Sequence, residues 1–359
     1  MVQVLTVKVK LLPTKEVEKI LEEMGKEYIS VVNGLVHEMV DEKKVTKKTS
    51  KHVQANIPSV LKSQAIRDAS SIFLKKVKKS DYKIIPILKR PICIWNNQNF
   101  TFNSTHIHVP IFIDGKVRRV PIRALLEDKD GRSLKILQNK LGALRINKKS
   151  NKWIAQIAVT ILPVEKSELK IMGVDLGLKV PAVAVTCDMK VRFCGNGRQN
   201  KYMKRKFQTQ RKMLAKKKKL NALRNISDKE QRWMKDQDHK ISRKIINFAR
   251  DNNVSVIRLE KLANIRQTAR KSRKNDKSLH TWSFYRLSRF IEYKANLEGI
   301  RVEYVNPAYT SQTCPVCAVK NKVKNRKYIC GCGYRTHRDI VGAMNIRYAP
   351  VIDGKSQSA

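Results

Sequence analysis

Three acidic residues stand where the sequence predicts the ends of buried elements. Asp175 follows the apolar run Ile-Met-Gly-Val, Glu260 ends the run Val-Ser-Val-Ile-Arg-Leu, and Asp339 lies at the expected start of a helix. Singly, each is explained by a capped turn or, for Asp339, by the positive end of the helix dipole. Together they could hold two Mg²⁺ ions, because hard divalent cations prefer oxygen ligands and such a pair assists phosphodiester hydrolysis. Spacing along the chain does not establish that the three side chains meet.

The cysteines fall into two groups. Two residues lie between Cys314 and Cys317, and a single glycine lies between Cys330 and Cys332. Two close pairs on tight turns can surround one tetrahedral Zn²⁺ ion with four thiolates. A disulfide is the alternative, and a reducing compartment disfavours it. We therefore predict one structural zinc ion on these four cysteines. The other cysteines are expected to be buried, unreactive thiols in strands: Cys93, Cys187 and Cys194.

A long acid-free stretch, residues 189–227, carries many cations. On a helix these charges cannot all lie on one face, so we expect the stretch to contact phosphate groups on more than one side. A charged helix that is exposed only to solvent is the alternative. The cations expected to bind nucleic acid are Arg198, Lys201, Lys204, Arg205, Lys206, Arg211, Lys212, Lys216, Lys217, Lys218 and Lys219.

The whole chain has the charge balance of a protein that binds a polyanion. Its 359 residues include 76 Lys and Arg against 30 Asp and Glu, a formal net charge of +46. Such self-repulsion destabilises a fold unless a partner neutralises it, and nucleic-acid phosphates are the obvious partner. Hydrophobic residues make up 42% of the chain, which excludes a wholly disordered protein. No stretch approaches the roughly 20 apolar residues of a membrane-spanning helix. The N-terminus lacks a signal-peptide core, so we expect a cytosolic protein with no membrane partner.

The elements that must position these residues begin with an antiparallel sheet. Residues 2–11 alternate apolar and polar side chains, which predicts a half-buried strand. Helical patterns follow at residues 14–40 and after Pro58. Residues 83–163 contain short alternating runs and an Asp-Gly turn, which predict antiparallel strands. Because the first strand otherwise lacks a partner, we expect it to join this sheet, with the helices inserted between.

From about residue 167 the pattern changes to a mixed α/β sheet. The predicted strands cover residues 169–175, 180–187, 189–194, 254–259 and 300–305, and the predicted helices cover residues 198–225, 227–251 and 282–297. A polar, basic stretch at residues 264–280 lacks any apolar periodicity. We expect it to form a mobile loop after Glu260 that covers a site.

Four sequence blocks in this half resemble the signature blocks of the TnpB family, the transposon-encoded RNA-guided DNA nucleases related to type V CRISPR effectors. The blocks are Gly-Val-Asp-Leu-Gly at 173–177, Arg-Leu-Glu-Lys-Leu at 258–262, Thr-Ser-Gln-Thr-Cys-Pro-Val-Cys at 310–317 and His-Arg-Asp-Ile-Val-Gly-Ala-Met-Asn-Ile at 337–346. Their order, spacing and identity argue against a chance match. The specific resemblance covers roughly residues 167–350. The first 165 residues match the family in length and layout only.

The resemblance implies a multidomain fold of the α/β plus β class. An N-terminal wedge-like β-barrel would hold an inserted helical recognition domain. A C-terminal RuvC-like nuclease domain of RNase H-like fold would hold a zinc-binding insert. The implied boundaries are 1–12 and 83–165 for the barrel, 13–82 for the recognition domain, 167–306 and 335–350 for the nuclease domain, 307–334 for the insert and 351–359 for a flexible tail.

The resemblance also implies an activity, the Mg²⁺-dependent cleavage of target double-stranded DNA beside a short adjacent motif. Asp175, Glu260 and Asp339 match the catalytic carboxylates of the family, and the four paired cysteines match its zinc ligands, although one intervening residue in the second pair departs from the commoner two. A guide RNA from the transposon end would pair with one DNA strand. Such a protein would be cytoplasmic and associated with the nucleoid through nucleic acid.

Two other functions suit the same residues. A nuclease-silent, RNA-guided DNA-binding repressor is one, but such a protein would be expected to lose catalytic carboxylates. A DNA-strand-transferring transposase of the same fold is the other. The cysteine pairs between Glu260 and Asp339 favour the guided nuclease over a transposase.

Overall fold

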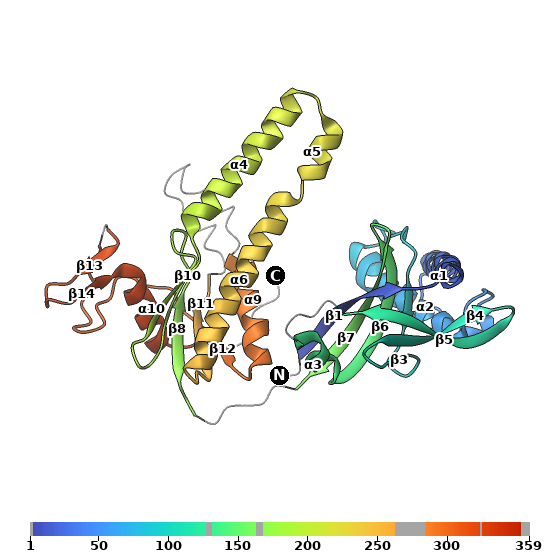
Figure 1. The fold of residues 1–359 in the computed structure, drawn as a ribbon, viewed down its shortest axis with the longest axis horizontal. Coiled ribbons are helices and arrows are strands. Elements are labelled where there is room, and N and C mark those ends of the chain that lie inside the picture. Colours follow the sequence, from blue (N-terminus) through green and yellow to red (C-terminus); the bar gives the residue numbers. More distant parts are fainter. Residues whose placement is uncertain (1–2, 127–130, 163–167, 263–283, 324, 353–359) are drawn as a thin grey trace. The chain divides into compact units, whose positions relative to one another are not determined.

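The computed structural model describes residues 3–126, 131–162, 168–262, 284–323 and 325–352. The chain divides into two compact units, Met1–Leu162 and Pro163–Ala359, whose elements are labelled in Figure 1. The loop expected at 264–280 and most of the tail expected at 351–359 lie outside the described residues. Within the ranges described, no helix has both the length and the apolar character needed to cross a membrane.

The first unit is built on one antiparallel sheet of seven strands in the order β2-β6-β7-β1-β5-β4-β3. Its strands are β1 (Gln3–Leu12), β2 (Cys93–Trp95), β3 (Thr101–Phe102), β4 (His106–Ile113), β5 (Lys116–Leu125), β6 (Lys140–Lys149) and β7 (Lys152–Ile161). β1 pairs with both β5 and β7, which confirms that the first strand joins the later sheet. The Trp95 indole on β2 donates to the Pro110 carbonyl on β4 at 3.2 Å. Because β2 and β4 lie near opposite ends of the strand order, the sheet must be curled.

The segment between β1 and β2 carries the helices of this unit. α1 (Lys15–Asp41) begins at Thr14, whose side chain accepts a hydrogen bond from the Val17 amide, and α2 (Ser59–Ile72) follows Pro58. Both starts match the prediction. The apolar side chains of α1 recur at helical spacing and are buried. The Tyr28 hydroxyl joins the two helices by donating to Asp68 at 2.7 Å. Shorter turns complete the unit: η1 (Ser50–His52), η2 (Phe73–Val77), η3 (Lys78–Ser80) and α3 (Arg132–Leu137).

The second unit is built on a mixed sheet of five strands in the order β10-β9-β8-β11-β12. The strands are β8 (Ile171–Asp175), β9 (Ala182–Val185), β10 (Val191–Cys194), β11 (Val256–Glu260) and β12 (Arg301–Val305). β8, β11 and β12 are parallel, whereas β9 is antiparallel to both of its neighbours. The predicted mixed sheet is therefore confirmed. A separate hairpin of β13 (Lys327–Ile329) and β14 (Arg335–His337) lies between β12 and the last helix in sequence.

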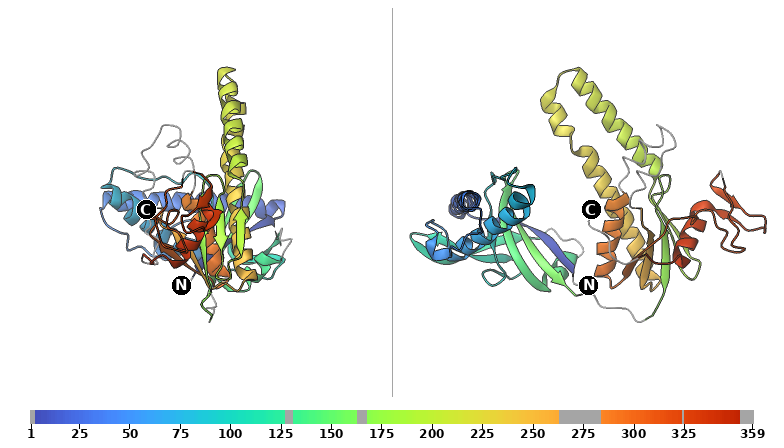
Figure 2. Two further views of the ribbon diagram at one scale, coloured as in Figure 1. Left: turned by 90° about the vertical axis from the view of Figure 1, so that its left-hand side faces the viewer. Right: turned by 180° about the vertical axis from the view of Figure 1, so that it is seen from behind.

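Helices cover both faces of the five-stranded sheet. α6 (Lys229–Asp251) and α9 (Phe284–Leu297) bury Ile245 and Leu287 against Val174 of β8. α10 (Arg338–Tyr348) buries Ala343 against Val185 of β9 on the opposite face. α4 (Gly197–Lys216) and the first part of α6 extend beyond the sheet as a helical hairpin joined through α5 (Leu220–Ile226), as Figures 1 and 2 show.

Two local predictions are wrong. The single helix expected at 198–225 is broken between α4 and α5, because Lys218 has a φ of 52°, in the left-handed region that no α-helix contains. Cys187 is exposed rather than buried, because β9 ends at Val185 and the thiol lies in the turn beyond it. Cys93 and Cys194 are buried as predicted, and burial raises their pKa values to about 12 and about 11, as expected for unreactive thiols.

Candidate active site and metal centre

The ends of two parallel strands bring two of the predicted carboxylates together. Asp175 ends β8 and Glu260 ends β11, and the register pairs Val174 with Leu259 one residue earlier. Val174 and Leu259 belong to the core that α6 and α9 cover. Since successive side chains of a strand point to opposite faces, both carboxylates lie on the other face of the sheet, the one that α10 covers.

α10 supplies the third carboxylate. The helix is capped by His337, whose Nδ1 accepts a hydrogen bond from the Asp339 amide at 3.2 Å. Asp339 is buried in the first turn, where the helix dipole favours a negative charge. An acidic residue therefore suits this position, and the packing of α10 decides what the Asp339 side chain faces.

Two glycines allow α10 to lie directly on the sheet. A Cβ atom on Gly173 of β8 would overlap the carbonyl oxygen of Ala343 in α10. A Cβ atom on Gly342 would lie 2.8 Å from the Asp175 carboxylate oxygen Oδ2. A larger residue at Gly173 would meet the backbone of α10 and push the helix off the sheet, so Gly173 determines how closely α10 packs on β8. A larger residue at Gly342 would instead displace the Asp175 carboxylate.

All three predicted carboxylates line one cavity of about 880 Å³. Other side chains that reach this cavity are mostly cationic or polar: Lys179, Thr310, Ser311, Asn325, Arg326, Lys327 and Arg338. The cavity therefore combines a cluster of acids with surrounding cations. The acids suit a metal ion, and the cations suit the phosphate groups of a substrate.

Two of the acids, Asp175 and Glu260, have raised pKa values. Burial and then the negative charges of Glu260 and Asp339 raise the pKa of Asp175 to about 8, against an opposing effect of Arg326. Burial also raises the pKa of Glu260, which a hydrogen bond from Thr310 opposes. Crowded, partly desolvated carboxylates need a positive counter-charge. Because every donor among them is a carboxylate oxygen, the residues fit Mg²⁺.

Arg326 supplies such a charge at one of the acids. It directly precedes β13, and its Nη1 contacts both carboxylate oxygens of Asp339. Among the described residues, only the paired cysteines form a group of metal-ligating side chains whose ligand atoms all lie within 4.8 Å. The three carboxylates do not form such a group among the described residues, and the Arg326 guanidinium contacts one of them, Asp339.

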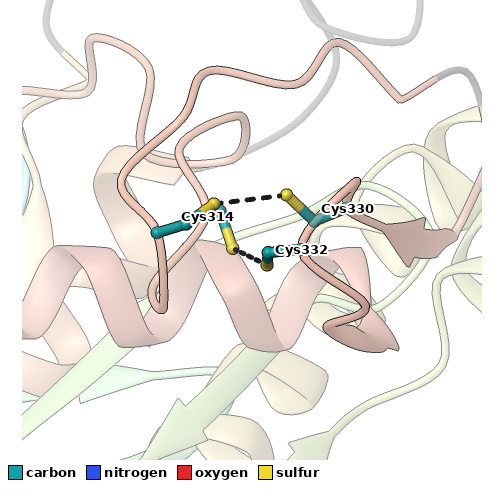
Figure 3. A group of neighbouring side chains, drawn as sticks. Cys314, Cys330 and Cys332 are labelled. Carbon is teal, nitrogen blue, oxygen red and sulfur yellow. Dashed lines mark hydrogen bonds between the residues drawn. The ribbon is translucent and has the colours of Figure 1, made fainter.

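The paired cysteines form a compact cluster. The sulfur atoms of Cys314 and Cys332 lie 3.7 Å apart and those of Cys317 and Cys330 lie 3.5 Å apart. Figure 3 shows the labelled thiols turned toward one another. A tetrahedral zinc ion with Zn–S bonds of about 2.3 Å holds its sulfurs about 3.8 Å apart. The two separations are near this value and all four sulfurs lie within 4.8 Å of one another, so the cluster can hold one Zn²⁺ ion. The single residue between Cys330 and Cys332 does not prevent this arrangement.

Metal analysis of the purified protein is expected to find about one zinc ion per chain, because four thiolates complete a tetrahedral shell. Cys314→Ser should lower the zinc content and the thermal stability of the second unit, since metal binding contributes folding free energy. Cys187→Ser is the matched control, because that exposed thiol lies outside the cluster. A full zinc complement in the Cys314→Ser protein would contradict this assignment.

The predicted nucleic-acid-binding cations occupy α4 and the turn after it. Two of them face the hairpin rather than solvent. Arg211 forms an ion pair with Glu230 of α6 at 2.6 Å, and burial lowers the pKa of Lys204. Glu230 of α6 thus neutralises one positive charge of the stretch 189–227, which itself contains no acidic residue. The remaining predicted cations are exposed: Arg198, Lys201, Arg205, Lys206, Lys212, Lys216, Lys217, Lys218 and Lys219.

The sequence pattern predicts the carboxylates but not the side chains around them. Thr310 and Arg338 fall inside the blocks that resemble the TnpB family, so the resemblance was the available signal for them. Lys179 and Arg326 carry no signal of their own, because a chain with 76 Lys and Arg offers many cations near any acid. Only the fold distinguishes these two.

Relatives of this chain are found by sequence. Residues 284–346 match the family model described as Cas12f1-like, TNB domain. The chain is 38% identical over 149 residues to the TnpB-like protein MJ0751 of Methanocaldococcus jannaschii, a match that covers 40% of this chain and 53% of that protein. It is 27% identical over 218 residues to the CRISPR-associated endodeoxyribonuclease Cas12f1 of Sulfoacidibacillus thermotolerans, covering 55% of this chain and 50% of that one. The chain thus spans about half the length of these relatives.

The fold has a counterpart among solved structures. The chain resembles the protein in the cryo-EM structure of the Cas12f1-sgRNA-target DNA complex with a TM-score of 0.66 and 16% sequence identity. The similarity covers 93% of this chain and 83% of that one. It therefore includes the first unit, for which the sequence offers no quotable motif. The overall fold of this chain is therefore similar to that of Cas12f1.

Proposed function

We propose that this chain is a TnpB family protein and an RNA-guided endonuclease that cuts double-stranded DNA beside a short adjacent motif, a proposal that its sequence relatives and its fold support. The observation that carries the proposal is the meeting of Asp175, Glu260 and Asp339 in one cavity from two strand ends and a helix start. The names of the Cas12f1 relatives, which call them endodeoxyribonucleases, support it.

In this proposal the three carboxylates hold two Mg²⁺ ions. When bound, the ions would activate water and stabilise the leaving oxygen of the phosphodiester. The chain's own groups bind and orient the substrate: Lys179 and Arg338 face the cavity and would neutralise phosphate oxygens. Arg326, now paired with Asp339, lies close enough to the acids to do the same for the phosphate that is cut.

The proposal includes a domain assignment. The second unit corresponds to the RuvC-like nuclease domain, since its strand order combines an antiparallel β8-β9-β10 part with parallel β11 and β12. Residues 307–334 form the zinc-binding insert. The first unit corresponds to the wedge-like barrel with its inserted helical recognition domain, which the curled sheet and the position of α1 and α2 between β1 and β2 support. The division of the chain into two compact units after Leu162 supports this assignment.

The partners proposed are a guide RNA from the transposon end and target double-stranded DNA. None of the strands β1 to β7 contains an Asp or a Glu, so the sheet of the first unit presents no acid that would repel phosphate. The exposed cations of α4 add a second basic surface. An RNA–DNA heteroduplex recognised through its backbone requires such surfaces rather than base-reading groups. Action on DNA would associate the protein with the nucleoid.

Neither alternative function gains support. A repressor without nuclease activity does not need three acids crowded in one cavity, because their mutual repulsion costs stability. A strand-transferring transposase would share the acids, but the relatives carry the names of TnpB-like and CRISPR-associated proteins.

The test is the dependence of cleavage on the guide. Protein stripped of RNA is expected to lose specific DNA binding and cleavage, because base pairing with the guide carries the sequence specificity. Reconstitution with RNA sequenced from the purified complex should restore the cutting of a matching target only. Equal cutting of matched and mismatched targets would exclude guidance, and undiminished cutting without RNA would indicate a non-specific nuclease.

A further inference from the structure

Glu260 is held by a side chain from another part of the fold. Thr310 is buried, and its hydroxyl donates a hydrogen bond to Glu260 Oε1 at 2.5 Å, with a longer approach of 3.2 Å to the Pro307 carbonyl. A hydrogen bond to a carboxylate is among the stronger ones that a protein makes. Glutamate has one more side-chain torsion than aspartate, so the end of β11 alone does not determine where its oxygens lie.

Thr310 is itself fixed by the helix that carries Asp339. Asn345 of α10 donates from Nδ2 to the carbonyl oxygen of Thr310 at 2.6 Å and to that of Thr313 at 2.7 Å. Both protons of one amide are therefore used on one short segment, residues 310–313. As a result, α10 positions Asp339 directly and Glu260 through Thr310.

The other two residues of this segment are also held. The buried Tyr328 of β13 donates to the Gln312 carbonyl at 2.9 Å, and Arg338 Nη2 donates to the Ser311 hydroxyl at 3.2 Å. The residue that follows the segment is Cys314, the first cysteine of the cluster. The segment thus runs from the hydrogen-bond donor of an active-site acid to a zinc ligand, and each of its residues is tied to the surrounding fold.

We infer that Thr310 is a positioning residue for Glu260 and that residues 310–313 make the metal affinity of the carboxylate site depend on an intact cysteine cluster. The inference rests on the proposed function, in which Glu260 holds a divalent metal ion. It adds that the cysteine cluster, which has no free coordination position for chemistry, acts on the cavity through the placement of one hydroxyl group.

The first experiment measures Mn²⁺ binding to the full-length protein by electron paramagnetic resonance, without nucleic acid. Thr310→Val removes the donor and keeps the shape, and we expect the Mn²⁺ affinity to fall about 10- to 100-fold, as for other groups that hydrogen-bond a metal ligand. Thr310→Ser keeps the hydroxyl and should retain most of the wild-type Mn²⁺ affinity. The matched control is Thr313→Val, because the Thr313 hydroxyl contacts the Tyr309 carbonyl at 3.2 Å and not an acid.

Cleavage by the guide-loaded complex provides a second readout. The Mg²⁺ concentration for half-maximal rate should rise in Thr310→Val, while the rate at saturating Mg²⁺ should recover most of its wild-type value. A purely structural defect would instead lower the rate at every Mg²⁺ concentration. If the Thr310→Val protein loses its zinc or no longer unfolds cooperatively, Thr310→Ala replaces it as the variant without a hydroxyl. It is then compared with Thr310→Ser in the same two measurements.

The link to the cysteines is tested by a double-mutant cycle. Cys314→Ser should weaken Mn²⁺ binding in the wild-type background and add little in the Thr310→Val background, because both changes act through the same hydroxyl. Fully additive effects would overturn the coupling, and unchanged Mn²⁺ affinity in Thr310→Val would overturn the positioning role. A wild-type protein that neither binds Mn²⁺ nor cleaves would instead refute the proposed function, so the two failures are distinguishable.

Discussion

Replacing Asp175, Glu260 or Asp339 singly by alanine is expected to reduce target cleavage to below about one hundredth of the wild-type rate, because loss of even an outer hydrogen-bond partner of a metal ligand costs 10- to 100-fold. Guided DNA binding should persist, since the exposed cations of α4 and the acid-free sheet are untouched. Cleavage assays with EDTA and Mg²⁺ add-back, run beside gel-shift measurements, separate the two effects.

Asp188→Ala is the matched control for these variants. Asp188 is an exposed acid of the same unit that does not line the cavity, so its loss should leave cleavage unchanged. Substantial cutting by any of the three cavity variants would remove that residue from the catalytic assignment.

Asp175→Asn separates catalysis from stability. Burial and repulsion raise the pKa of Asp175, so its ionised form destabilises the metal-free protein. The cost to folding is absent below the unfolded-state pKa of 3.8 and grows as the pH rises to about 8. Asp175→Asn removes this cost, so near pH 8 the unfolding temperature of the metal-free protein should rise while cleavage is lost. A lower unfolding temperature would show that the carboxylate is held by contacts that offset its burial.

The second large effect is expected at a residue without a side chain. Gly173→Val places atoms where the Ala343 carbonyl of α10 lies, and no side-chain rotamer relieves an overlap that begins at Cβ. Overpacking of a core costs typically 1–3 kcal/mol. We expect a loss of about 3 kcal/mol or more here, because the atoms nearest the added Cβ, the Ala343 oxygen and the Arg347 nitrogen, belong to the backbone of α10 and cannot rotate away. Urea denaturation of the second unit measures this cost, and cleavage should be lost with it because α10 carries Asp339.

Gly331→Ala provides the control for this prediction. A Cβ atom on Gly331 meets no atom within 4 Å, so the substitution should leave stability near that of the wild type. Wild-type stability in Gly173→Val would mean that α10 does not pack on β8 as described.

The sequence by itself determined the local elements of this protein. The alternation at its start predicts β1, the apolar spacing after Thr14 predicts α1, and the apolar runs that end at Asp175 and Glu260 predict β8 and β11. These predictions succeed because burial on one face of a strand or helix imposes a period of two or about 3.6 residues on neighbouring positions, and a period is visible in the sequence.

Local patterns were less informative where a turn decides the outcome. The lysines around Lys218 continue a helical composition, yet a left-handed residue breaks the helix there. Cys187 continues an apolar run, yet β9 ends two residues earlier and leaves the thiol exposed. In both cases the neighbouring residues permit either conformation, and the contacts of the rest of the unit select one.

The site itself was decided by the tertiary structure. Parallel pairing of β8 with β11 sets Asp175 beside Glu260, although 84 positions of sequence separate them. The packing of α10 against Gly173 then places Asp339 with them, and it brings Thr310 to Glu260 through Asn345. No periodic pattern in the sequence predicts that these side chains lie together, because their proximity depends on which strands pair and which helix crosses them. The residue types predicted the chemistry of the site, whereas long-range packing assembled it.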